Sequence, residues 1–130
     1  MKNLRSILAL TVLATFIAGA HAQAAEQPAP TNEPLLREAI ESAPGMMLQV
    51  GKLTVAPGYS AASHSHPGET FVYVLEGRIL NQIGDEEPKT YEAGDFFFEH
   101  ANAKHAQFVN IDKEKPATVL IYGIRPEEAR

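Results

Sequence analysis

The chain has 130 residues, 45% of them hydrophobic, and it contains no cysteine. This length and apolar content are those of one small globular domain, whose stability does not depend on disulfides. The formal net charge at pH 7 is −5. Because nucleic acids are bound by positively charged surfaces, we expect no nucleic-acid partner.

Residues 1–22 have the pattern of a secretory signal peptide. Two basic residues precede an apolar run from Ser6 to Ala20, and Ala20 and Ala22 occupy the small-residue positions of a cleavage site. The run of about 15 residues is shorter than the roughly 20 that cross a bilayer core. We therefore expect cleavage after Ala22, with Ala24 as the second choice, and a periplasmic or secreted protein with no membrane contact after cleavage. A retained membrane anchor is the alternative.

The segment after the predicted signal peptide divides into a linker and a helix. Residues 23–34 are polar and rich in proline, which predicts a disordered linker. The following residues place leucine, alanine and isoleucine at helical spacing, up to a Pro-Gly pair that ends the pattern. We therefore expect a short N-terminal amphipathic helix from Leu35 to Ala43, within a single domain that covers 35–130.

From Met46 onward, short apolar or alternating segments are separated by turn residues. Strands this short, with turns at this spacing, predict an all-β antiparallel sandwich or barrel. Three consecutive phenylalanines cannot all face inward, and we expect Phe96 and Phe98, which share a face, to fill or line the barrel. The expected strands are Met46–Val55, Ser63–His66, Thr70–Leu75, Arg78–Ile83, Lys89–Tyr91, Phe96–Glu99, His105–Asn110 and Thr118–Ile124.

Two histidines lie at alternate positions of one predicted strand. Side chains two residues apart on a strand project from the same face, so we expect His64 and His66 to lie side by side. A divalent metal ion accounts for two imidazoles on one face, since neutral imidazole binds zinc, iron, manganese, nickel and copper. The alternative is a pair of surface or hydrogen-bonded histidines, because a His-x-His pattern alone is a weak signal.

The surroundings of these histidines resemble the first motif of the cupin family. That motif runs Gly, five residues, His-x-His, three or four residues, Glu, six residues, Gly. Here Gly58, His64, His66 and Gly77 match it. The stretch "HPGETFVYVLEG" further resembles a group of small exported single-domain cupins.

The second cupin motif is also matched in part. It runs Gly, five residues, Pro-x-Gly, two residues, His, three residues, Asn, and "GDFFFEHANAKHAQFVN" begins at Gly94 with His105 at the histidine position. The resemblance implies a cupin double-stranded β-helix, a jelly-roll-like antiparallel barrel. It also implies one divalent transition metal held by His64, His66 and His105.

The first motif departs from the family at its glutamate. That position holds Thr70, and Glu69 lies one residue earlier. A shift of one residue turns a strand side chain to the other face, unless a bulge or the preceding turn redirects it. Three ligand sets therefore remain open: the three histidines completed by water, which we prefer, the histidines with Glu69, or the histidines with Gln82.

The second motif departs from the family in its Pro-x-Gly turn. His100 stands where the family has proline, and Asn102 stands where it has glycine. Asparagine adopts the left-handed conformation more readily than most residues with a side chain, so the second change is structurally mild. His100 is interpreted either as a base or alternative ligand at the metal or, more simply, as a turn histidine at the barrel mouth.

A metal with open coordination positions suits an enzyme that acts on a small polar molecule such as an oxo-acid. The resemblance points to a dioxygenase with iron, or to an isomerase or decarboxylase with zinc, nickel or manganese. Glu69 and His100 are the candidate acid–base catalysts, and Arg78 and Arg125 are either carboxylate-binding or surface arginines. The alternative is a non-catalytic module that binds or senses a metal or small ligand. A homodimer is a family-level expectation.

Overall fold

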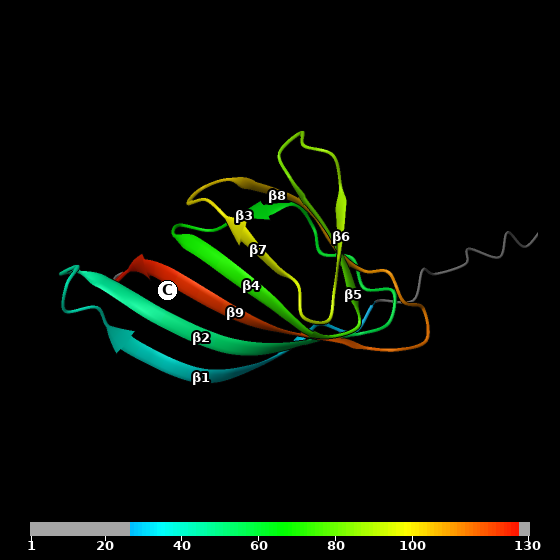
Figure 1. Cartoon of the computed structure of the whole chain (residues 1–130), viewed down its shortest axis with the longest axis horizontal. Coiled ribbons are helices and arrows are strands. Elements are labelled where there is room, and N and C mark those ends of the chain that lie inside the picture. Colours follow the sequence, from blue (N-terminus) through cyan, green and yellow to red (C-terminus); the bar gives the residue numbers. More distant parts are fainter. Residues whose placement is uncertain (1–26, 128–130) are drawn as a thin grey trace, which may run out of the picture.

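Two antiparallel β-sheets form the structure, a computed structural model that describes residues 27–127. Figure 1 shows the larger sheet as a curved layer, with the smaller sheet above part of it. The larger sheet has the strand order β1-β2-β9-β4-β7, and the smaller has the order β3-β8-β5-β6. The strands are β1 (Thr31–Ala39), β2 (Met46–Val55), β3 (His64–Ser65), β4 (Glu69–Glu76), β5 (Arg78–Ile83), β6 (Lys89–Glu92), β7 (Phe96–Glu99), β8 (Lys104–Asn110) and β9 (Ala117–Pro126).

The predicted all-β antiparallel, jelly-roll-like architecture is confirmed. Each predicted strand corresponds to one of β2 to β9; three have the predicted bounds, and the others differ by one or two residues at an end. The described residues contain no helix, and so none long and apolar enough to cross a membrane.

A hydrophobic core lies between the two sheets. On β4 the side chains alternate, so that Val72 and Val74 are buried while Phe71 and Tyr73 lie on the other face of the sheet. The two-residue period of a strand produces this division, and each buried side chain of this kind stabilises the fold by about 1.5–3 kcal/mol. The buried hydrophobic residues are Val55, Val72, Val74, Ile79, Phe97, Phe108, Ala117 and Val119.

The helix predicted from Leu35 to Ala43 is wrong. The segment belongs to β1 as far as Ala39, and β1 pairs with β2 from Thr31 opposite Thr54 to Ala39 opposite Met47. A helix of this length is marginal in water on its own, whereas pairing with β2 supplies a ladder of backbone hydrogen bonds. The spacing of apolar residues along the segment contains no information about that partner.

The predicted linker is shorter than expected. Thr31–Pro34, its last part, lies in β1, where Pro34 is tolerated because β1 is an edge strand and the register shifts after it. Residues 27–30 have no regular secondary structure. Residues 23–26, like the predicted signal peptide at 1–22, lie outside the described residues.

The phenylalanines of β7 face opposite to the expectation. Phe97 is buried in the core, whereas Phe96 and Phe98 are 53% and 37% exposed on the outer face. Phe98 packs there against Phe71, with 4.7 Å between ring centroids. The inward face of β7 is shared by Phe97 and Glu99, so counting apolar residues assigned the wrong face.

Candidate metal centre

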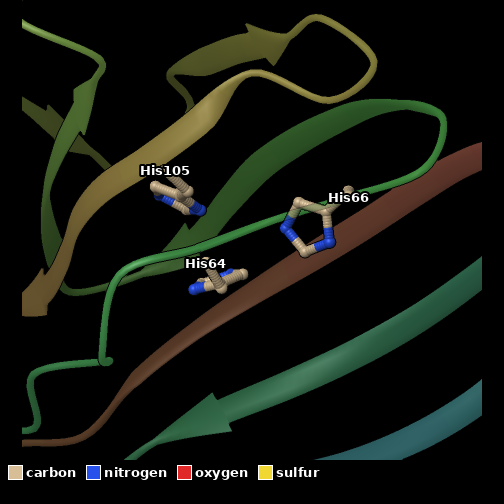
Figure 2. A group of neighbouring side chains, drawn as sticks. All are labelled: His64, His66 and His105. Atoms are coloured by element: carbon tan, nitrogen blue, oxygen red, sulfur yellow. The ribbon is translucent and has the colours of Figure 1, made fainter.

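Strand pairing brings three histidines together. His64 on β3 lies directly opposite His105 on β8, and His66 comes directly after the end of β3, two residues beyond His64. The ring centroid of His64 lies 4.8 Å from that of His66 and 4.9 Å from that of His105. Figure 2 shows the three rings gathered between the segments that carry them. One nitrogen of each ring lies within 4.8 Å of the others, so the three side chains could hold a metal ion.

A bulge in β8 turns His105 toward the interior. His105 and Phe108 are three residues apart, yet both are buried, which strict alternation forbids. The pairing of β8 with β5 accounts for this, because its register shifts between Gln82 opposite Gln107 and Ile83 opposite His105. The extra residue resets the alternation and directs the imidazole inward.

A tight turn holds the segment that carries His66. The backbone N–H of Asn102 donates to the carbonyl of His66 at 2.7 Å. Asn102 has a φ of 60°, so the asparagine found at the motif's glycine position does adopt the left-handed conformation.

Hydrogen bonds orient two of the rings. Nδ1–H of His64 donates to the carbonyl of Ala62 at 2.8 Å, which leaves Nε2 with its lone pair available to a metal. Nε2 of His105 contacts Oδ1 of Asn81, a buried side chain on β5.

Glu99 is the residue of the site that the sequence analysis missed. It lies on β7 opposite Thr70 of β4, is 3% exposed, and faces the histidines. Its Oε1 lies 3.2 Å from Nε2 of His105, and its Oε2 lies 3.6 Å from Nε2 of His66. The alternation within β7 contained the signal, because an inward Phe97 places Glu99 on the same inner face.

Burial shifts the protonation of this cluster toward neutral forms. It lowers the pKa of His66 to about 4, helped by His64 and Arg125, and lowers the pKa of His105 to about 4, helped by His64 and His66. It raises the pKa of Glu99 to about 7. At pH 7 both imidazoles are therefore neutral, so their contacts with Glu99 are not ion pairs despite the short distances. Neutral imidazole is the form that binds metals.

Glu69 and Gln82, the candidate fourth ligands, lie away from the histidines. Strand alternation places Glu69 on the face of β4 opposite to Thr70, as its one-residue offset predicts. Gln82 accepts a hydrogen bond from Nε2 of Gln107 at 2.5 Å and donates to a backbone carbonyl at 2.9 Å. In each case the neighbouring residue, Thr70 or Asn81, is the one buried toward the site.

His100 also lies away from the histidines. It is exposed after the end of β7 and packs edge-on against Phe98, with 4.6 Å between ring centroids. His100 is not among the residues of the histidine cluster or of the cavity beside it, and its position against Phe98 on the outer face agrees with the simpler interpretation as a turn histidine.

A cavity of about 150 Å³ adjoins the three histidines. Its other walls are Thr70 and Glu99, four apolar side chains, and Arg125 from the end of β9. A Cβ atom at Gly123 would lie 2.7 Å from Nε of Arg125, so the glycine leaves room for the guanidinium over the sheet. A groove of about 400 Å³ that Arg125 also lines continues toward β1 and β2.

The sequence over residues 51–122 matches the family described as "Cupin domain". The chain is a cupin. Its two glycine-flanked histidine motifs, on β3 and β8, are thus those expected from the resemblance in the sequence. No curated protein matches this cupin significantly in sequence.

Solved structures share the fold of this cupin at low sequence identity. A cupin superfamily protein of Desulfitobacterium hafniense has a TM-score of 0.61 and 14% identity, over 79% of this chain and 84% of its own. A conserved Klebsiella pneumoniae protein with a double-stranded β-helix domain has a TM-score of 0.57 and 20% identity, over 83% of this chain and 84% of its own. The DMSP lyase DddQ of Ruegeria pomeroyi has a TM-score of 0.56 and 20% identity, over 64% of this chain and 40% of its own. At such identities these structures show the fold alone.

The side chains of this cupin's cluster fit a first-row divalent ion. Imidazole nitrogen and carboxylate oxygen are ligands for such ions, and one nitrogen from each of His64, His66 and His105 points into one small volume. Both oxygens of Glu99 and Nδ1 of His105 are buried without a hydrogen-bond partner among the described residues. A cation between the rings and the carboxylate would satisfy the two oxygens.

Proposed function

We propose that this cupin binds one divalent transition metal through His64, His66 and His105 and uses it to bind, and to act on, a small oxo-acid. The observation that carries the proposal is the convergence of three imidazoles at a small cavity that Arg125 also lines. The metal remains one of iron, manganese, nickel, zinc or copper, because imidazole ligands suit all of them.

The cavity supports a small carboxylate as the ligand. A cavity of about 150 Å³ in another protein encloses a molecule the size of benzene, so the volume here suits a ligand of about six non-hydrogen atoms. Arg125 would pair with the carboxylate through its planar guanidinium, and the apolar walls would exclude water around the rest. A metal held by the histidines would polarise a carbonyl oxygen or activate a water.

A non-catalytic module that binds or senses a metal or a small ligand is the second candidate function. The observation that favours it is the placement of Glu69 and His100, the two expected acid–base catalysts, away from the cavity. Turnover would then require another group to transfer protons, and Glu99 is the carboxyl group that lines the cavity. The fold does not decide this, since one fold carries many functions.

Metal content and uptake test the metal site. The mature protein is purified without an affinity tag, analysed by mass spectrometry for metals, and titrated with each ion. We expect about one equivalent in the native protein, and losses in His64→Ala and His105→Ala. His100→Ala is the matched control, because it removes an exposed imidazole outside the cluster, and it should keep full occupancy. Full occupancy in both cluster variants would refute the site.

Ligand binding separates the oxo-acid proposal from its alternatives. Calorimetric titration of the metal-loaded protein compares pyruvate with hydroxyacetone, a neutral molecule of similar size. Tighter binding of pyruvate supports a carboxylate ligand, and equal binding contradicts it. Oxygen-consumption, isomerase and decarboxylase assays on oxo-acids then distinguish an enzyme from a binding module.

Export and oligomeric state are further parts of the proposal. The pattern of residues 1–22 supports a cleaved signal peptide and a periplasmic or secreted location. Intact mass of the protein from the periplasm should correspond to a chain that begins after Ala22. Light scattering on the same sample tests the homodimer that the family leads us to expect.

A further inference from the structure

We infer that Glu99 supplies a carboxylate ligand to the metal site from β7, in place of the glutamate that the cupin motif puts at the position of Thr70 on β4. The inference rests on the proposed metal site. It adds a ligand that lies in the second motif's segment, at a position for which neither motif specifies a residue.

The pairing of β4 with β7 makes this exchange geometrically simple. Thr70 and Glu99 are direct cross-strand partners, and they are 2% and 3% exposed, so both face the same interior. Side chains directly opposite each other on paired strands have Cβ atoms about 4.5–5.5 Å apart. The backbone positions of the two residues are therefore about one glutamate side-chain length apart, so a glutamate at either position can bring its carboxylate to the same place. Both side chains line the cavity that adjoins the three histidines.

The distances around Glu99 agree with ligands on one ion. Metal–ligand distances of about 2.0–2.2 Å place adjacent ligand atoms about 3.0 Å apart in octahedral and about 3.4 Å apart in tetrahedral geometry. Oε1 of Glu99 lies 3.2 Å from Nε2 of His105, and Oε2 lies 3.6 Å from Nε2 of His66. One ion can therefore contact both rings and the carboxylate, provided that Nε2 of His105 gives up its contact with Oδ1 of Asn81, because a nitrogen that donates its proton to an amide oxygen has no lone pair left for a metal.

The described residues around Glu99 provide no hydrogen-bond donor for its two carboxylate oxygens. Both oxygens are buried, and neither accepts a hydrogen bond from the described residues. A carboxylate without partners is costly to bury, and two acceptor oxygens beside imidazole nitrogens form an electron-rich pocket that a cation would stabilise. Glu69, by contrast, lies on the opposite face of the neighbouring strand.

Cobalt(II) binding to the full mature chain tests the inference. Affinity is measured by competition with a chelating dye, and the visible absorption of bound cobalt reports its ligands. Glu99→Gln keeps the shape but removes the charge, and we expect it to weaken cobalt affinity by at least about tenfold and to change the spectrum. Glu69→Gln is the matched control, and its affinity should stay within about twofold of the native value.

An exchange variant completes the design. Glu99→Thr combined with Thr70→Glu returns the carboxylate to the motif position, and we expect affinity within about threefold of the native protein. If Glu99→Gln fails to fold, this variant decides alone: near-native affinity supports the inference, and a loss of tenfold or more in folded protein overturns it.

The outcomes separate this inference from the proposed function. A native protein that binds no cobalt overturns both. A native protein that binds cobalt and loses it in His64→Ala, while Glu99→Gln keeps native affinity and spectrum, overturns the role of Glu99 alone.

Discussion

Replacing Asn110 with alanine should remove a large part of the stability of the fold. Asn110 ends β8, the strand that carries His105, and its side chain is completely buried. Its Nδ2 donates to the carbonyls of Val55, Ala56 and Lys115 at 3.2, 3.1 and 2.9 Å, and its Oδ1 accepts from the N–H of Asp112 at 3.1 Å. One amide thus ties the end of β8 to the end of β2 and to the loop before β9.

The size of the loss follows from these contacts. An amide NH₂ has two hydrogens, so its three carbonyl contacts amount to about two full hydrogen bonds, and the bond from Asp112 adds a third. At about 1 kcal/mol each, Asn110→Ala should lower the free energy of unfolding by about 3 kcal/mol. For a domain of this size that corresponds to a fall in Tm of about 12–24 °C.

Urea unfolding of the metal-free protein, followed by circular dichroism, measures this effect. The urea concentration at the midpoint of unfolding should fall, while the dependence of the unfolding free energy on urea concentration stays constant. This combination identifies a change in stability rather than in the compactness of the unfolded state. Asn32→Ala, which changes an exposed asparagine of β1, serves as the control and should stay within about 0.5 kcal/mol. A loss below about 1 kcal/mol for Asn110→Ala would refute the reasoning.

Three further predictions concern the cavity and its charges. Arg125→Gln should keep the metal but weaken pyruvate binding about 10- to 100-fold by calorimetry, because a charge-assisted hydrogen-bonding partner is lost. Gly123→Ala should reproduce part of that loss, since its Cβ would displace the guanidinium; unchanged pyruvate affinity in a folded protein would contradict the placement of Arg125. The metal-free protein should gain stability in calorimetric scans as the pH rises from about 4 to 6.5, because His66 and His105 bind fewer protons folded than unfolded there. Glu99, whose pKa is raised to about 7, opposes this rise, so Glu99→Gln should steepen it, and an unchanged slope would contradict the assignment.

The sequence predicted the structure well wherever the two-residue period of a strand determined both the fold and the positions of the candidate site residues. The strands after Met46 were predictable from alternation and turn residues, and so was the gathering of His64 and His66 on one face. The left-handed turn at Asn102 was also foreseeable, because asparagine tolerates a positive φ.

The failures share one physical cause, which is that pairing partners are not visible along the chain. The segment at Leu35 has helical spacing, but an open strand edge at β2 decided its structure. Along the chain, the carboxylate next to Thr70 is that of Glu69, whereas Glu99 is the residue opposite Thr70 across the sheet. A motif aligned position by position cannot reveal a neighbour that is almost thirty residues away in sequence.

The short length of β3 has a consequence for the rate at which a metal would enter and leave. Two residue pairs with β8 hold β3 at the edge of the smaller sheet, while His105 and Glu99 lie on longer or more buried strands. Local opening of an element with so few backbone hydrogen bonds requires much less free energy than global unfolding. His64 would then move away while His105 and Glu99 stay in place, and His66 would stay attached to the turn through the hydrogen bond that its carbonyl accepts from the N–H of Asn102. Exchange of the metal would therefore follow the fraying of this one edge, and amide hydrogen exchange at His64 and Ser65 would report its frequency.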